Sequence, residues 1–248
     1  MPDLPADPSA PTPAGRRFPH RPRLALALDV DDLVEAVELV TLLSPWFGVA
    51  KVGLELFSAA GPEAVAALRE RDVDVFVDLK LHDIPTTVGK AARVLGSVGA
   101  RYVTLHAQGG PAMLEAGVGG LFEGASRAGA DRPMALAVTV LTSDNDAPPH
   151  IVPQRVRMAA EAGCGGLVCA AGDLDVAGRF GPGLFRVVPG IRAAGAERHD
   201  QPRAVTPAEA FAAGADLLVV GRAVSAAPDP AAAAEALFAD LAIVPSGT

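Results

Sequence analysis

Residues 73–85 read Val-Asp-Val-Phe-Val-Asp-Leu-Lys-Leu-His-Asp-Ile-Pro, a largely apolar run that ends in charged residues and then in proline. The β-branched and aromatic residues predict a buried strand over residues 73–79, and Pro85 predicts the first turn of a helix. Asp78 and Lys80 are two residues apart, so an extended backbone points both side chains to the same face. Charged side chains rarely enter a core unless they are paired or take part in chemistry. The pair is therefore either a structural ion pair at the end of a strand or part of a reactive site.

The same unit, a short apolar run followed by a helical segment, recurs along the chain. The candidate strands are residues 24–28, 48–54, 73–79, 102–106, 134–141, 166–170, 185–189 and 217–220. Helical segments open with proline in the first turn at Pro62, Pro85 and Pro207. Eight such units predict a closed (β/α)8 TIM barrel of the α/β class. An open doubly wound sheet is the alternative, but it usually needs a glycine-rich turn after the first strand, where this chain has Asp29-Val30-Asp31-Asp32.

Composition limits the kind of partner. The 248 residues are 50% hydrophobic, which suffices for a large core, and the net charge is -8 with no run of Lys or Arg. We therefore expect neither a nucleic-acid backbone nor an anionic membrane as a partner. No apolar stretch is long enough to span a membrane, and the first residues lack the basic-then-apolar order of a signal peptide, so the expected location is the cytoplasm.

The ends of the domain follow from local composition. Residues 1–22 are rich in Pro, Ala and Asp and show no hydrophobic period, so we expect a disordered tail before a single barrel domain at residues 23–244. The two cysteines, Cys164 and Cys169, belong to no Cys/His cluster with zinc spacing. They are expected to be reduced thiols in the core.

In a (β/α)8 barrel the active site lies at the carboxyl ends of the strands, so the polar residues that end each apolar run are the candidates. They are Asp29, Lys51, Asp78, Lys80, Asp83, His106, Thr142, Ser143, Arg192, Gly221 and Arg222. A lysine ammonium can act as an acid at neutral pH, whereas an arginine guanidinium cannot readily do so. The alternative is that Lys51 and Lys80 only neutralise neighbouring carboxylates. His106 fits a packed barrel histidine better than a catalytic one.

Two glycine-arginine turns predict a phosphate site. Gly221-Arg222 follows the last strand, and Gly190-Ile191-Arg192 follows the strand before it. Barrels commonly hold phosphate at these two loops, where backbone N–H groups face the ligand and an arginine can clamp it. The long polar loop 192–205 carries Gln201 and is expected to join this site. Gly221-Arg222 taken alone would be a weak signal that also fits a plain turn.

Together these motifs resemble the orotidine 5'-phosphate (OMP) decarboxylase family over residues 23–242. The centre of the resemblance is the pattern Asp-x-Lys-x-x-Asp-Ile-Pro at residues 78–85. The flanking motifs are Asp29, Lys51-Val52-Gly53, Leu105-His106-Ala107, Leu141-Thr142-Ser143, Pro189-Gly190-Ile191-Arg192, Asp200-Gln201 and Gly221-Arg222. Related barrels that act on keto-sugar phosphates carry the shorter Asp-x-Lys-x-x-Asp, so Ile84-Pro85 and Asp200-Gln201 carry the discrimination.

The resemblance implies a TIM barrel that converts OMP to UMP and CO2 in pyrimidine biosynthesis without a metal or an organic cofactor. It implies an alternating charge network of Lys51, Asp78, Lys80 and the partner subunit's Asp83, and therefore a homodimer. Lys80 would protonate the pyrimidine carbon that loses CO2, with Asp78 facing the substrate carboxylate. The implied binding residues are Asp29, Lys51, Asp83 and Thr87 for the ribose, Thr142 and Ser143 for the base, Gln201, Gly221 and Arg222 for the phosphate, and Arg192 at the start of the loop that closes over it.

Two other interpretations remain at this point. A Mg²⁺-dependent decarboxylase or aldolase of keto-sugar phosphates would need a further acidic metal ligand near the first three strands. A catalytically inactive barrel that binds a nucleotide or serves only as an assembly subunit would have no turnover for a Lys80 substitution to abolish.

Overall fold

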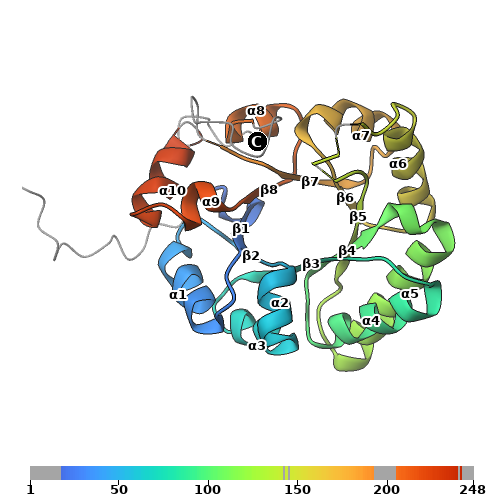
Figure 1. Cartoon of the computed structure of the whole chain (residues 1–248), viewed down its shortest axis with the longest axis horizontal. Helices are drawn as coiled ribbons and strands as arrows, with labels where there is room; N and C mark the ends of the chain where they lie inside the picture. The colour runs from blue at the N-terminus through green and yellow to red at the C-terminus, as the bar shows by residue number, and fades with distance from the viewer. Residues whose placement is uncertain (1–17, 142, 145, 193–204, 240, 242–248) are drawn as a thin grey trace, which may run out of the picture.

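The computed structural model describes residues 18–141, 143–144, 146–192, 205–239 and 241. Eight parallel strands form a closed barrel in which each strand pairs with the next along the chain and β8 pairs with β1 (Figure 1). The strands are β1 (Leu24–Leu28), β2 (Val49–Val52), β3 (Asp74–Leu81), β4 (Tyr102–His106), β5 (Met134–Val138), β6 (Gly166–Val168), β7 (Phe185–Pro189) and β8 (Leu217–Val220). The predicted (β/α)8 barrel is confirmed, and the open doubly wound sheet is excluded.

Helices surround the barrel and connect consecutive strands (Figure 1). They are α1 (Leu33–Leu43), α2 (Leu54–Ala60), α3 (Pro62–Arg69), α4 (Pro85–Ser97), α5 (Pro111–Ala128), α6 (Ile151–Glu161), α7 (Leu174–Phe180), α8 (Pro207–Ala212), α9 (Arg222–Ser225) and α10 (Pro230–Phe238), with short 3-10 turns η1 (Arg21–Arg23), η2 (Ala107–Gly109) and η3 (Ala171–Asp173). Local sequence sets the helix starts. Asp32 caps α1 by accepting hydrogen bonds from two backbone N–H groups, and Thr206 and Glu209 form a capping box at α8.

Four strands end at residues other than the predicted ones. β6 stops at Val168 instead of residue 170, because Ala170 is already the cap of the turn η3. β2 stops at Val52 because Gly53 is the cap of α2, which begins one residue later. β5 stops at Val138 because its partner β6 also ends, at Val168, so no ladder remains to extend it. β3 runs on to Leu81, two residues farther than predicted. The last difference bears on function, because the added residues include Lys80.

The strands are apolar on both faces because both faces are buried. Side chains that face outward, such as Leu24, Leu26 and Leu28, pack under the helices. The inward-facing apolar side chains form a separate cluster, made of Ala25, Ala27, Val49, Phe76, Tyr102, Leu136, Val187, Leu217 and Val219. This cluster fills the interior of the barrel below its mouth, that is, on the side of the amino-terminal ends of the strands. The inward-facing positions that come later along each strand therefore lie at the carboxyl-terminal mouth of the barrel.

The described chain begins before the predicted domain boundary. Phe18 stacks on Phe238 with ring centroids 5.6 Å apart, and His20 stacks on Phe211 at 5.7 Å. Residues 18–22, which the sequence assigned to the tail, therefore pack against the barrel, because their aromatic rings have apolar surface to bury. Residues 1–17 lie outside the described part.

Helices α4 and α5 pack backbone to backbone, side by side in Figure 1. A Cβ atom on Gly120 would clash with the carbonyl oxygen of Gly89, and one on Gly124 would clash with that of Arg93. Glycine at these positions therefore permits the close approach of the two helices. Because α4 begins at Pro85, its packing against α5 sets the position of residues 82–85, which follow the charged end of β3.

The two cysteines are buried and do not form a disulfide. The predicted position of both cysteines in the core is confirmed, and this burial raises the pKa of the Cys164 and Cys169 thiols to about 12. In the described ranges, no helix has the length and apolar character needed to cross a membrane.

Candidate active site

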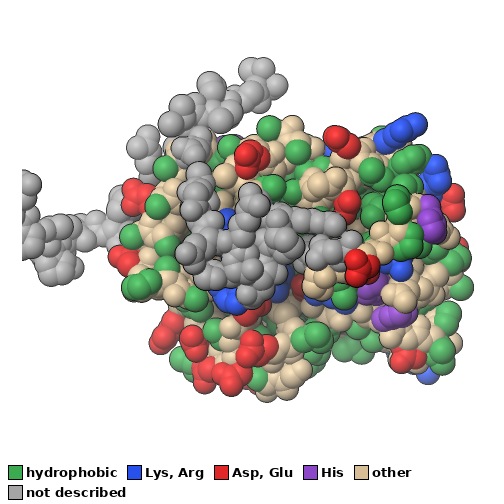
Figure 2. All heavy atoms as spheres, turned by 45° about the horizontal axis from the view of Figure 1, so that its top comes forward, with side chains coloured by type: hydrophobic (Ala, Val, Ile, Leu, Met, Phe, Trp, Pro, Cys, Tyr) green, Lys and Arg blue, Asp and Glu red, His purple; other side chains and the backbone are tan. Residues whose placement is uncertain are grey.

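A cavity of about 270 Å³ opens at the carboxyl-terminal mouth of the barrel. Eight of the residues predicted for the site line it: Asp29, Lys51, Asp78, Lys80, Ser143, Arg192, Gly221 and Arg222. Figure 2 turns this side toward the viewer and shows basic side chains near the middle of the face, with acidic side chains gathered below them. The cavity therefore brings together most of the residues that the sequence predicted for the site, although they come from separate strands.

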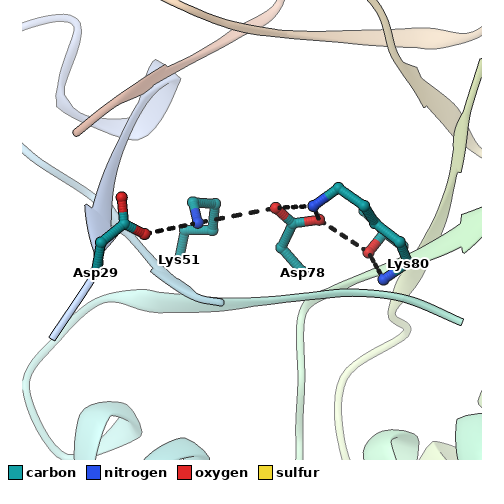
Figure 3. A network of polar contacts seen from close by, with 5 residues as sticks. Asp29, Lys51, Asp78 and Lys80 are labelled. Carbon is teal, nitrogen blue, oxygen red and sulfur yellow. Dashed lines mark hydrogen bonds and ion pairs between the residues drawn. The ribbon is translucent and has the colours of Figure 1, made fainter. Parts of the chain in front are cut away.

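Four of these side chains form a row of alternating charge across the mouth (Figure 3). The Lys51 ammonium lies 3.4 Å from Asp29 Oδ1 and 3.8 Å from Asp78 Oδ2. The Lys80 ammonium donates to both carboxylate oxygens of Asp78 at 3.0 Å. The row runs negative, positive, negative, positive, so each charge has an opposite neighbour and the desolvation of the inner members is offset.

Strand alternation explains how three of the four reach the cavity. Ala27, Val49 and Phe76 belong to the inward-facing apolar cluster. Asp29, Lys51 and Asp78 each come two residues later, so they point inward one layer higher. Lys51 and Phe76 are also ladder partners, which places the inward residues of β2 and β3 side by side.

Lys80 reaches the cavity by a different route. Its φ is +50°, a left-handed conformation that is rare for a side chain with a Cβ atom. The register between β3 and β4 shifts at this point, because Val77 pairs with Val103 but Leu81 pairs with Leu105. Simple alternation predicted the inward direction of Lys80 but not this bulge.

Thr104 is a polar member of the site that the sequence analysis missed. It is fully buried on β4, and its hydroxyl donates to Asp78 Oδ1 at 3.0 Å and accepts from the Lys80 backbone N–H at 2.8 Å. A lone hydroxyl at an inward position, two residues before the strand-end His106, was the signal that could have found it.

His106 is buried and lies outside the lining of the cavity, as expected for a packed barrel histidine. Its Nδ1 accepts a hydrogen bond from the Gln108 backbone N–H at 3.2 Å, and its ring stacks on His82 with centroids 5.4 Å apart. Burial lowers the pKa of His106, and the neighbouring His82, Arg155 and Lys80 lower it further. At neutral pH this ring is therefore uncharged.

Two loops that carry arginine also line the cavity. Pro189 at the end of β7 pairs with Val219 on β8, so Gly190–Arg192 and Gly221–Arg222 leave the barrel next to each other. The Arg192 backbone N–H donates to the Val205 carbonyl at 3.1 Å. Arg192 and Arg222 are both among the residues that line the cavity, and their role in binding phosphate stays a prediction.

The part of the chain that the structure describes contains no group of three or more His, Cys, Asp or Glu side chains placed to hold a metal ion.

A family model described as "Orotidine 5'-phosphate decarboxylase / HUMPS family" matches residues 22–237. The chain belongs to this family. Among curated relatives, the OMP decarboxylase of Moorella thermoacetica is 44% identical and covers 92% of this chain and 95% of its own length. That of Halorhodospira halophila is 46% identical and covers 90% and 98%. A crystal structure of OMP decarboxylase from Lactobacillus acidophilus has a TM-score of 0.74 at 33% identity and covers 88% of this chain and 97% of its own.

For four residues, the structure does not test the role that the resemblance to the OMP decarboxylase family implied. Asp83 and Thr87 are exposed at the start of α4 and do not line the cavity of their own chain. Asp83 instead accepts a hydrogen bond from the Ile84 backbone N–H at 2.6 Å. Thr142 and Gln201 lie outside the described residues. The roles of these four residues stay predictions.

Proposed function

We propose that this protein converts OMP to UMP and CO2 in pyrimidine nucleotide biosynthesis. The observation that carries the proposal is the Lys80 ammonium, held 3.0 Å from both Asp78 oxygens beside a cavity of about 270 Å³. The curated relatives support the substrate, because those at 44% and 46% identity over most of both chains are named OMP decarboxylase.

The proposed reaction uses Lys80 twice. Departure of CO2 breaks a bond to the pyrimidine ring and leaves the electron pair on the ring carbon. A fixed ammonium beside that carbon stabilises the negative charge as it develops. Lys80 then transfers a proton from Nζ to the carbon, which completes UMP, and the neutral amine regains a proton from water. Because one side chain supplies both charge and proton, no metal or organic cofactor enters the proposed reaction.

The remaining cavity residues are proposed to bind the substrate. Arg222, Gly221 and Arg192 would hold the phosphate where β7 and β8 end, together with Gln201. Asp29 and Lys51 would take the ribose hydroxyls, with Thr142 and Ser143 at the base. Two arginines beside a cavity suit a phosphate monoester, because guanidinium groups bind phosphate oxygens in pairs. Binding energy from the phosphate can then help to exclude water around the reacting carbon.

The active unit is proposed to be a homodimer. Asp83 and Thr87 are exposed, and Ile84 between them has 66% of its surface exposed. Such a segment can enter the mouth of a second copy, where the partner subunit's Asp83 would extend the row of charges beyond Lys80. The site of a single chain is incomplete on this proposal, because these residues do not line their own cavity.

Purified protein mixed with OMP tests the activity, followed by the absorbance change of the pyrimidine. Wild type should convert OMP, and Lys80→Ala should bind OMP yet lose conversion by several orders of magnitude. The exposed Lys90→Ala on α4 is the control and should convert OMP like wild type. A wild-type protein without conversion, or an active Lys80→Ala, would contradict the proposal.

Mixed subunits test the shared site. Lys80→Ala and Asp83→Ala should each be inactive alone. A heterodimer of the two contains one pocket with both residues intact, so mixing them should restore activity. If no mixture regains turnover while both variants remain dimeric, Asp83 does not act across an interface.

The Mg²⁺-dependent decarboxylase or aldolase of keto-sugar phosphates remains the competing activity. Exhaustive treatment with a chelator separates the two, since the proposed reaction should continue at an unchanged rate. Loss of OMP conversion on chelation, with recovery on addition of Mg²⁺, would favour the metal-dependent mechanism.

A further inference from the structure

The ladder between β3 and β4 is uneven where the site begins. Val77 pairs with Val103, and the next pair is Leu81 with Leu105. Three residues of β3, 78 to 80, thus face the single residue Thr104 of β4. A strand with extra residues bends out of the sheet and loses regular backbone partners there. The bulge must therefore find hydrogen bonds elsewhere for its buried polar groups.

The Thr104 hydroxyl meets this need. It accepts a hydrogen bond from the Lys80 backbone N–H at 2.8 Å, in the place where a regular ladder would supply a carbonyl. A hydroxyl has one hydrogen, so that hydrogen is free to point to Asp78 Oδ1, 3.0 Å away. The direction of both bonds is thereby set. A single side chain holds the backbone of one charged residue and the carboxylate of the other.

Resting on the proposed function, we propose that Thr104 is a positioning residue for the decarboxylation: its hydroxyl holds the left-handed backbone at Lys80 and aims the Asp78 carboxylate at the Lys80 ammonium. Thr104 does not line the cavity and is fully buried, so it acts through Asp78 and Lys80 and not on the substrate. The left-handed conformation at Lys80, with φ +50°, costs energy for a residue with a Cβ atom. Without the bond from its N–H, Lys80 would relax toward an ordinary strand conformation and carry its ammonium away from the reacting carbon.

Substitutions at Thr104 and a matched threonine test the proposal. Thr104→Val keeps the shape and removes the hydroxyl, whereas Thr104→Ser keeps the hydroxyl. Thr139→Val is the control, because Thr139 is also fully buried and its hydroxyl donates only to the Val168 carbonyl, at 3.2 Å. Each variant is compared with wild type for kcat, KM, melting temperature and the exchange rate of the Lys80 amide proton measured by NMR.

Thr104→Val should lower kcat by about 10- to 100-fold, as expected when a reacting group is misplaced by a fraction of an ångström, while KM stays within about threefold. The Lys80 amide should exchange at least about tenfold faster, because its hydrogen-bond acceptor is gone. Thr104→Ser should recover kcat to within about threefold of wild type. Thr139→Val should keep its kcat within about twofold even if its melting temperature falls.

Several outcomes would overturn the proposal. A wild-type kcat in Thr104→Val would do so, and so would a Thr104→Ser variant as slow as Thr104→Val. If Thr104→Val does not fold, Thr104→Ala takes its place, and failure of both to fold would assign the hydroxyl to stability alone. A wild type that does not convert OMP refutes the proposed function, whereas the Lys80 amide exchange still reports on the positioning by Thr104.

Discussion

Removal of Lys51 tests whether the charges at the barrel mouth are energetically coupled. The Lys51 side chain is 11% exposed, and its ammonium lies 3.8 Å from Asp78, which is 14% exposed. Two unit charges near 4 Å attract by roughly 4 kcal/mol at an effective dielectric constant of about 20. Desolvation of both groups offsets part of that attraction, which leaves an expected coupling of ~1.5–3 kcal/mol. Asp29 adds less than ~1 kcal/mol, because at 49% exposure water screens its pair with Lys51.

A double-mutant cycle measures this coupling. Urea unfolding of wild type, Lys51→Met, Asp78→Asn and the double variant gives four free energies of unfolding. The double variant should lose ~1.5–3 kcal/mol less than the sum of the two single losses. The exposed pair of Arg127 and Glu123, one turn apart on α5, is the control and should show a coupling of only ~0.3–0.5 kcal/mol. Additivity of Lys51 and Asp78 within ~0.5 kcal/mol would refute the reasoning, because it would show that solvent already screens the pair.

Three further predictions follow from packing and burial. Gly120→Ala should lower the free energy of unfolding by ~1–3 kcal/mol, because the new Cβ would clash with α4. Gly119→Ala is the control: nothing lies within 4 Å of its new Cβ, so it should be neutral or stabilising by up to ~1 kcal/mol. Equal effects of the two substitutions would exclude the clash. A pKa of about 12 leaves roughly one Cys169 thiol in 10,000 ionised at pH 8, so iodoacetamide should label it only after unfolding, and rapid labelling of native protein would contradict its burial. Burial lowers the pKa of His106 below 6.5, so as the pH falls the unfolded chain binds a proton at this residue before the folded protein does. The free energy of unfolding should therefore decrease as the pH falls through 6.5. His106→Gln should flatten this part of the curve of unfolding free energy against pH, and an unchanged slope would exclude the contribution of His106.

The barrel was predictable because its strands carry a strong local signal. Each strand is buried on both faces, which makes it a short apolar run that stands out between polar helices. Strand ends were harder, because they depend on the neighbouring strand. β5 was predicted to reach residue 141 but ends at Val138, where β6 stops offering a partner. The sequence of β5 alone contains no signal for an end at this position.

The residues of the site also differ in whether the sequence alone could predict them. Asp29, Lys51 and Asp78 were predictable, because each follows an inward apolar residue by two positions on a strand. Thr104 was not, because a threonine inside an apolar strand is typical of ordinary packing. Its contacts depend on a cross-strand register in which three residues face one, and neither β3 nor β4 encodes that register alone. Asp83 stays a prediction for a similar reason, since its proposed role requires a second subunit.

The strained backbone at Lys80 and the direction of its side chain depend on the same contacts. Among the described residues, the non-glycine residues with positive φ are Asp72, next to β3, and Lys80, inside it. The conformation of Lys80 costs roughly 1–2 kcal/mol, and the surrounding contacts must offset it. Those contacts are the Thr104 hydroxyl on the backbone N–H and the Asp78 carboxylate on the ammonium. Because the same contacts also aim Lys80 into the cavity, relaxing the strain would remove the geometry that the proposed proton transfer needs. Stability at Lys80 and activity are therefore expected to fall together when either contact is lost.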